Sequence, residues 1–302
     1  MRLNRLVLAL PGLVLAALVL TLPTPALAAR ASLPDMPVER VRTDAARRVA
    51  ALLAPRMNGL EIGERDDGET TLITVVEPPL SEESVAQAAG CIAPYLTDAR
   101  LPEPVTQATF TCAEATIVVT PLGSPEDGGA LLVAALASRT SLAWLERLSR
   151  SAAGDASPGV GNGRHAGSSG DGDERADLRA TVVPPSVREL AGSLTAFGPV
   201  APTVLIDPAG ALRACLFLPR TLEALPLARF ARDLYAALEG SELGEVSSVT
   251  LRVGAQRVVL RAMDGASGEA TMLVGAGPVD RPGLARIELD RAATRLGALV
   301  RS

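Results

Sequence analysis

Aromatic and lysine side chains are nearly missing from this chain of 302 residues. Aromatics make up 2% of the sequence, and every one of the 29 basic residues is an arginine. With so few aromatic side chains a protein can hardly build platforms on which bases stack, and a net charge of -5 opposes binding to a phosphate backbone. The missing lysine also removes Schiff-base chemistry and the lysine of a Walker-type phosphate loop. The composition therefore predicts no nucleic-acid partner.

Histidine is also scarce, which limits the chemistry that the folded parts can perform. The single histidine, His165, lies in a stretch rich in Gly, Ser and Asp, where a catalytic triad or a histidine metal site has no rigid support. The sequence contains no Gly-rich phosphate loop, Cys-x-x-Cys pair or His/Cys cluster. We therefore expect no enzymatic activity, no cofactor and no bound metal.

The three cysteines, Cys91, Cys112 and Cys215, are an odd number and cannot form a closed disulfide framework. Cys112 shares a strand face with Phe110, and Cys215 lies inside an apolar run, so both are predicted to be small buried residues. A Cys91–Cys112 disulfide is the alternative, if the helix that carries the first packs on the strand that carries the second.

Pairs of carboxylates occur at Asp66-Asp67, Glu82-Glu83 and Asp171-Asp173. Such pairs can act as acid/base dyads or bind calcium. These positions are predicted to be a turn, the first turn of a helix and a polar tether, where acidic residues are expected for solvation and for the helix dipole. Solvation and the helix dipole therefore explain all of these acidic residues without a catalytic role.

The first 29 residues have the layout of a secretory signal. Arg2 and Arg5 precede an apolar run over residues 6–22, and small residues at Ala26 and Ala28 predict cleavage after Ala28. The run is at the short limit for spanning a bilayer, so an uncleaved membrane anchor through residues 6–22 is the alternative, and a cytoplasmic helix is the third. We expect an exported or membrane-anchored protein.

A polar stretch over residues 151–185 divides the rest of the chain. Over 151–180, Gly, Ser, Asp and Ala displace nearly every large apolar side chain, so this segment cannot bury enough surface to order itself. A flexible coil of about 25–30 residues has a root-mean-square span of roughly 25–30 Å, enough for two small domains to lie side by side. The predicted domains are residues 38–150 and 186–302.

The two predicted domains repeat one pattern. Residues 105–123, VTQATFTCAEATIVVTPLG, align without a gap with the stretch that begins at Val246, VSSVTLRVGAQRVVLRAMD. Around both hairpins the hydrophobic periodicity predicts the order α-β-β-α-β-β-β-α. We expect two α+β domains, each a five-stranded antiparallel sheet with helices on its faces.

Several positions in these elements are predicted individually. Ser81 and Ser186 are candidate N-caps of helices. In the last helix of the second domain, the apolar positions include Leu284, Ile287, Leu296 and Leu299.

The second domain resembles the Roadblock/LC7 family, within the wider group of profilin-like α+β folds. The resemblance is carried by the element order, by D-P-A-G-A-L at 207–212, by S-V-T-L-R-V-G at 248–254 and by L-V-G-A-G-P at 273–278. The first domain departs from the family pattern in its first hairpin, E-R-D-D-G-E, and is identified mainly by its similarity to the second.

The resemblance implies a non-catalytic module that dimerises through edge strands and a central helix. It also implies a protein partner, either a Ras-like small GTPase or the other subunits of a scaffold. Edge strands carry unpaired N–H and C=O groups, and a tethered twin satisfies them at high effective concentration. We therefore expect the two domains to pair within the chain as a pseudo-dimer. Export conflicts with a cytosolic GTPase, whereas an anchor with the domains inside the cell does not.

Three residues are candidates for an interface, each with a plainer alternative. Trp144 is a partner-binding hot spot or, beside Leu145 and Leu148, part of a helix core. Arg257 and Arg261 face a partner or are solvated strand positions. The alternative function is an extracytoplasmic module that senses a small ligand, which requires an enclosed pocket lined by several polar groups.

Overall fold

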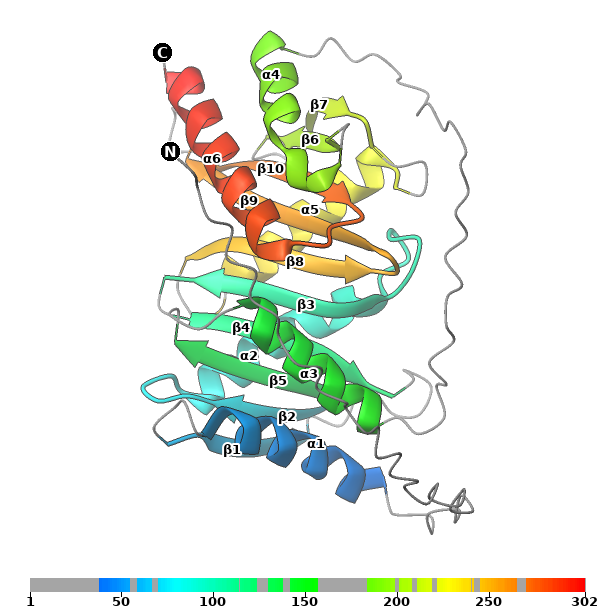
Figure 1. Cartoon of the computed structure of the whole chain (residues 1–302), viewed down its shortest axis with the longest axis vertical. Coiled ribbons are helices and arrows are strands. Elements are labelled where there is room, and N and C mark those ends of the chain that lie inside the picture. Colours follow the sequence, from blue (N-terminus) through cyan, green and yellow to red (C-terminus); the bar gives the residue numbers. More distant parts are fainter. Residues whose placement is uncertain are drawn as a thin grey trace, which may run out of the picture. The chain divides into compact units, whose positions relative to one another are not determined.

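The predicted element order is found in both halves of the computed structural model (Figure 1). The structure describes residues 38–54, 59–66, 70–113, 115–123, 130–137, 142–156, 184–198, 201–207, 211–218, 222–239, 241, 245–264 and 270–301. The signal-like segment, His165 and most of the predicted tether lie outside the described residues. We use first half for residues 38–156 and second half for residues 184–301.

Both halves consist of helices and strands in the same order. The first half contains α1 (Val38–Leu53), β1 (Glu61–Asp66), β2 (Thr71–Val76), α2 (Glu82–Ile92), the 3-10 helix η2 (Ala93–Thr97), β3 (Val105–Cys112), β4 (Ala115–Leu122), β5 (Ala130–Ala137) and α3 (Leu142–Ala156). The second half contains α4 (Pro185–Ser193), the 3-10 helix η4 (Thr195–Phe197), β6 (Thr203–Ile206), β7 (Leu212–Leu216), α5 (Ala224–Glu239), β8 (Val246–Val253), β9 (Gln256–Asp264), β10 (Ala270–Gly277) and α6 (Pro282–Arg301).

One of the two predicted helix caps is present. The Ser81 hydroxyl accepts a hydrogen bond from the backbone N–H of Ser84 at 3.4 Å, and Glu82 and Glu83 occupy the first turn of α2. The prediction for α4 was wrong, because its N-cap is Pro184 and its first residue is Pro185. Proline is favoured at the start of a helix because it has no N–H to leave unsatisfied there.

All ten strands belong to one sheet, where two sheets were expected. The strand order is β1-β2-β5-β4-β3-β8-β9-β10-β6-β7, so the halves meet where β3 pairs with β8 (Figure 1). Each half therefore contributes five adjacent strands. The edge strand β3 of the first half pairs with the edge strand β8 of the second half, so neither is an open edge at the junction.

The outer hairpins, β1–β2 and β6–β7, join the rest of the sheet in different strand orientations. In the first half β2 pairs with β5 in parallel, whereas in the second half β6 pairs with β10 in antiparallel orientation. The expectation of wholly antiparallel sheets was therefore wrong for the first half, and the sheet is mixed.

The apolar content of each strand explains this difference. The inner strand of each outer hairpin is buried almost throughout, TLITVV in β2 and TVLI in β6, and these sequences suit a position with neighbours on both sides. The outer strands are EIGERD in β1 and the half-exposed LRACL in β7. Charged side chains on an edge strand discourage pairing with other chains.

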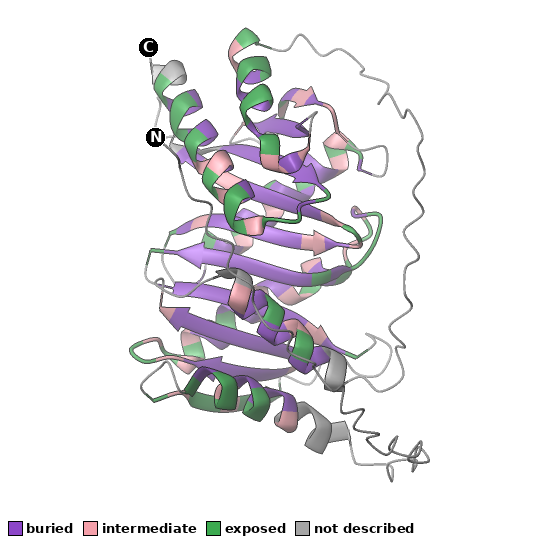
Figure 2. Ribbon diagram, viewed as in Figure 1, coloured by how far each residue is buried: buried purple, intermediate pink, exposed green. Residues whose placement is uncertain are grey.

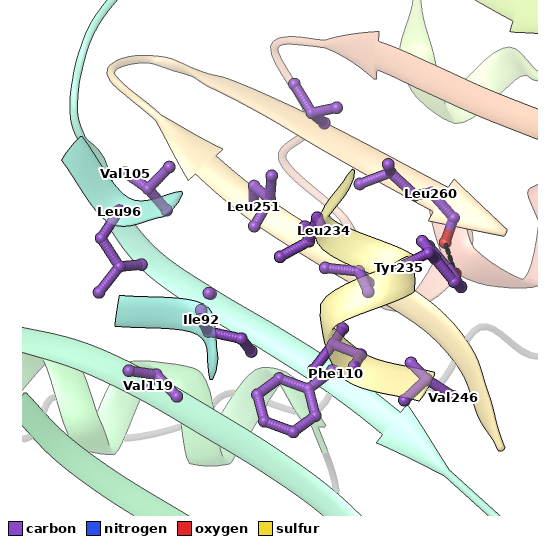
Figure 3. Close-up of a cluster of buried hydrophobic side chains, with 14 of the residues drawn as sticks. Ile92, Leu96, Val105, Phe110, Val119, Leu234, Tyr235, Val246, Leu251 and Leu260 are labelled. Carbon is purple, nitrogen blue, oxygen red and sulfur yellow. Dashed lines mark hydrogen bonds between the residues drawn. The ribbon is translucent and has the colours of Figure 1, made fainter. Parts of the chain in front are cut away.

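Helices cover both faces of the sheet. In Figure 1, α1, α3, α4 and α6 lie in front of the strands, and α2 and α5 lie behind them. The front face has two separate apolar cores, one under α1 and α3 and one under α4 and α6. On the back face a single core runs beneath α2 and α5 and includes side chains of both halves, as Figure 3 shows for Phe110, Leu234 and Leu251.

Burial follows from this sandwich of helices on the sheet. Figure 2 shows the central strands buried along most of their length, with exposed residues gathered on the outer sides of the helices. On β8, Val249 and Leu251 enter the shared core. None of the helices among the described residues combines the length and apolar composition needed to cross a membrane.

The structure also shows how far the apolar residues of α6 and the three cysteines are buried. On α6, Leu284 and Ile287 are 39% and 49% exposed, because the smaller Ala285 and Ala292 face the sheet together with Leu296. All three cysteines are free, so the alternative Cys91–Cys112 disulfide is not formed. Cys112 is buried as expected, and burial raises the pKa of its thiol to about 11, whereas Cys215 is only partly buried.

Candidate functional site: the junction between the halves

The strands that join the halves are the two that align in sequence. Thr109 of β3 stands opposite Thr250 of β8, and these two residues are 141 positions apart, the same separation as Val105 and Val246 at the starts of their strands. On either side, Ala108 pairs with Leu251 and Phe110 with Val249. A residue that contacts its own equivalent is what a two-fold axis between two alike surfaces produces.

A buried ion pair crosses the junction on the front face. The Glu146 carboxylate on α3 lies 2.8 Å from a guanidinium nitrogen of Arg257 on β9, and their side chains are 1% and 8% exposed. Thr109 also donates its hydroxyl to Glu146 at 3.2 Å. Gln107 donates its side-chain amide to the Glu146 carbonyl at 2.9 Å, which holds this turn of α3 against β3. Removing one member of such a pair leaves the other as an uncompensated buried charge.

Two more arginines surround the same carboxylate. Arg252 stands directly opposite Arg257 in the β8–β9 ladder, and like charges in that position repel. Arg150, one turn after Glu146, donates to the Glu146 carbonyl at 3.2 Å. Burial lowers the pKa of Arg150 and of Arg252, and the neighbouring guanidinium groups lower both further. Glu146 therefore neutralises a local excess of positive charge that belongs mainly to the second half.

An arginine of the second half also contacts the first half across the junction. Arg286 on α6 donates to the Thr111 hydroxyl on β3 at 3.1 Å. Arg261 on β9 stays within its own half, where it binds the Ser247 carbonyl and lies 3.0 Å from the Asp290 carboxylate. The front of the junction is thus polar between two apolar cores.

An aromatic contact joins the halves on the back face. Phe230 on α5 is fully buried, and the Tyr95 ring of the first half meets its ring edge to face with centroids 5.8 Å apart. The Arg100 guanidinium lies 5.5 Å from the same centroid. Tyr95 donates its hydroxyl to the Asp233 carbonyl at 3.0 Å. One side chain of α5 is therefore enclosed by two side chains of the first half.

Arg100 also links two carboxylates across the halves. It lies 2.6 Å from Asp98 of its own half and 2.6 Å from Asp233 of α5. Its hydrogen bonds lower the pKa of Asp98 and of Asp233, against the smaller opposing effect of burial. The two carboxylates in turn raise the pKa of Arg100. The ion pairs on both faces thus connect the first half to the second.

The structure brings one of the three candidate interface residues, Arg257, into contact with the other half. Arg257 is not a solvated strand position, because it is buried against Glu146 of the first half. Arg261 is half-buried and lies nearby on the same strand. Trp144 is half-buried on α3 and packs against the apolar core under α1 and α3. Sequence reasoning missed Glu146, although a charged residue between Leu145 and Leu148 on a core-facing side of the helix was the available signal.

Of the predicted carboxylate pairs, Glu82 and Glu83 occupy the first turn of α2, whereas Asp67, Asp171 and Asp173 lie outside the described residues. Within the described residues, no three His, Cys, Asp or Glu side chains come together as a metal site. A cleft of about 360 Å³ opens between η2 and the ends of three strands. Its lining is apolar or hydroxyl-bearing: Thr70, Ala93, Leu96, Thr97, Pro104, Val105, Thr106, Pro121, Leu122, Gly123, Ala130 and Leu131. A polar groove on α6 includes Glu288, Asp290 and Arg291.

Large apolar side chains are exposed on both faces. Leu284 and Ile287 lie on α6 at the front, and Leu225 lies on α5 at the back with 47% exposure. Leu52 on α1 and Ile62 on β1 are exposed at the outer end of the first half. Helices α3 and α6 are in contact on the front face, and Trp144 on α3 packs against the core under α1 and α3.

Comparisons with known proteins give similarity to solved structures only. No family model matches the chain, and no curated protein matches it. Among solved structures, the chain is similar to Myxococcus xanthus MglB, with 17% sequence identity and a TM-score of 0.32 over 38% of this chain and 94% of that chain. A similarity of this size does not assign a function, which has to come from the chain's own residues.

Proposed function

We propose that the chain is a non-catalytic protein-interaction module in which two Roadblock-like halves are paired as an internal pseudo-dimer. The observation that carries the proposal is the register of β3 on β8, where Thr109 meets its sequence equivalent Thr250. The core shared by α2 and α5 supports it, because side chains of both halves are buried together there. A continuous sheet with helices on both faces presents broad surfaces for a partner.

The partner that the sequence resemblance suggests is a Ras-like small GTPase, and a scaffold role is the broader form of the proposal. The surface that best suits a partner is the front of α3 and α6. Leu284 and Ile287 are exposed there, although most large apolar side chains among the described residues are buried, and Trp144 lies half-buried on α3 of the same face. Apolar and aromatic side chains provide most of the binding energy at protein interfaces.

Binding measurements with paired substitutions test this proposal. Ras-like small GTPases of the same organism are loaded with GDP or with a non-hydrolysable GTP analogue, and binding to the full chain is followed by biolayer interferometry. Ile287→Asp should weaken binding by about tenfold or more, because it places a charge in an apolar contact. Leu225→Asp is the matched control, since Leu225 is equally exposed on the opposite face. Absence of binding in both nucleotide states, or equal loss from both substitutions, would refute the GTPase partner.

The location of the protein is part of the same proposal. An anchor through residues 6–22 with both halves on the cytoplasmic side is compatible with a GTPase partner, whereas secretion is not. N-terminal sequencing of the mature protein, together with cell fractionation, separates these cases. A mature chain that begins after Ala28 outside the cytoplasm would leave the scaffold role and remove the GTPase.

A small apolar ligand is the second candidate. The cleft beside η2, at about 360 Å³, falls within the range of known ligand sites, and the described residues that line it carry no charge. Thr97 is exposed at the cleft, so Thr97→Trp should fill the opening without disturbing the core. Medium-chain fatty alcohols should raise the melting temperature of the parent chain and leave the variant unchanged. No stabilisation of the parent chain would remove this candidate.

A further inference from the structure

The two halves present unlike surfaces to each other at the junction. Helices α3 and α6 align at an offset of 140 residues, which places Leu145 on Ala285 and the pair Ala152 and Ala153 on Ala292 and Ala293. All of these residues are buried against the sheet. At this offset Glu146 and Arg286 occupy the same position in the two halves. Equivalent positions at the junction therefore carry opposite charges.

The residues that face these two positions differ in the same way. At the offset of 141 residues that aligns β3 and β4 with β8 and β9, Arg252 and Arg257 are the equivalents of Thr111 and Thr116. Glu146 of the first half meets the arginines of the second, and Arg286 of the second half meets Thr111 of the first. Glu146 thus faces positive charge, and Arg286 faces a hydroxyl that accepts its hydrogen bond.

We propose that the Glu146–Arg257 pair and the charges around it make the first half bind the second half in preference to another first half. This inference rests on the proposed internal pairing and specifies its selectivity. Two first halves would bury Glu146 against Thr111 and Thr116 and would lose the ion pair with Arg257, with Arg150 of the same helix remaining beside it. Two second halves would place Arg286 against Arg252 and Arg257, with Asp290 at the position of Arg150. Both alternatives replace the buried Glu146–Arg257 pair by charges that are less well compensated, which is costly.

Contacts on the back face also favour pairing of the first half with the second half over pairing of two first halves. Helices α2 and α5 align at an offset of 142 residues, so that the buried Val85 and Ile92 coincide with Leu227 and Leu234. At this offset the equivalents of Phe230 and Asp233 are Ala88 and Cys91. Two first halves would therefore lack the ring that Tyr95 and Arg100 enclose and the carboxylate that Arg100 binds. A tether alone brings the halves together, but it does not distinguish them from halves of other chains at high concentration.

A nicked chain tests the selectivity without the tether. A protease site placed between residues 157 and 183 of the full chain is cleaved after folding. Light and heavy-isotope preparations of the nicked protein are then unfolded together in urea and refolded. Native mass spectrometry identifies complexes of two first halves, two second halves or one of each, and mixed-isotope complexes show that the halves have re-paired. Partner binding is not measured, so failure of the proposed GTPase interaction does not affect the result.

The expected result is that each like-with-like complex is present at less than about a tenth of the mixed complex, the ratio that 1.4 kcal/mol produces. Re-pairing without preference would give the mixed complex only about twice the amount of each like-with-like complex. That distribution would overturn the proposal.

Variants of the intact chain provide a second measurement that does not depend on refolding of the fragments. Glu146→Arg should lower the melting temperature, because it reproduces the arginine crowding of two second halves. Adding Arg252→Thr and Arg257→Thr to Glu146→Arg should restore much of the lost melting temperature. The new arginine would then face threonines, as Arg286 faces Thr111. In the nicked form this triple variant should also form like-with-like complexes. Equal melting temperatures for Glu146→Arg and the parent chain would contradict the proposal.

Discussion

Single side chains hold the two halves together at a few defined points. Phe230 is one of these on the back face, because it comes from one half and contacts Tyr95 and Arg100 of the other. Glu146 has the corresponding role on the front face, where it is almost wholly buried beside Arg257. Substitution of any of these residues should therefore weaken the contact between the halves.

Phe230→Ala should lower the free energy of unfolding by about 3–5 kcal/mol, because it removes a buried ring and leaves a cavity between the halves. Urea unfolding followed by circular dichroism measures the change. Leu225→Ala on the same helix is the control, since that side chain is 47% exposed and its loss should cost no more than about 0.5 kcal/mol. Equal effects of the two substitutions would show that Phe230 is not a contact between the halves.

Acid should weaken the junction through Arg100. Its hydrogen bonds hold the pKa of Asp98 and of Asp233 below the ordinary value, so both carboxylates bind protons less readily in the folded chain than in the unfolded one. A depressed pKa contributes stability that is fully present above the unfolded value of about 3.9 and is lost as the pH falls through the folded value.

Arg100→Gln should therefore reduce stability at neutral pH and flatten its decline below about pH 4. Urea unfolding of both proteins between neutral pH and acid measures this difference. Arg47→Gln serves as the control, because among the described residues Arg47 pairs with Asp44 on the exposed side of α1. A pH dependence that Arg100→Gln leaves unchanged would show that other groups control acid unfolding.

At the scale of elements, the outer hairpins show how composition selects topology. In each half the more apolar strand of the hairpin lies inside the sheet, although it is the second strand of the hairpin in one half and the first in the other. Edge positions receive the charged or half-exposed strands. The sequences of β1 and β2 contain enough information for this assignment, but an expectation of two identical copies concealed it.

The close contact of β10 with η4 gives a prediction of its own. A Cβ atom at Gly275 would lie 2.8 Å from the Phe197 ring, which is itself buried. Gly275→Ala should therefore destabilise the protein by about 1–3 kcal/mol. Gly90→Ala in α2 is the control of opposite sign, because no atom lies within 4 Å of its added Cβ and alanine favours a helix by about 0.5–1 kcal/mol. Thermal unfolding distinguishes the two, and a stabilising Gly275→Ala would contradict the contact.

For the molecule as a whole, the central fact is that the halves share a core. The back-face cluster contains residues of β3, β8, α2 and α5, so neither half can open there without exposing apolar side chains of the other. The front-face clusters are separate for each half. Cooperativity between the halves should therefore come mainly from the back of the sheet.

Hydrogen exchange should report this arrangement. Amides of β3 and β8 should exchange much more slowly than those of the edge strands β1 and β7, because their opening requires the shared core to separate. Exchange followed by mass spectrometry of peptides measures each strand in the intact chain. Peptides of α2 and α5 provide an internal comparison on the same core. If β3 and β8 exchanged as fast as β1, the halves would be separating readily in solution.

The sequence by itself determined the order of elements in both halves and the relation between residues 105–112 and 246–253. It did so because hydrophobic periodicity, turn residues and helix caps act over a few residues. Only the tertiary structure decided that these two strands pair, which outer strand lies inside, and which side of α6 faces the sheet. It also decided that Glu146 meets Arg257, 111 residues away. These outcomes depend on the burial of whole surfaces against one another, and local sequence does not specify that competition.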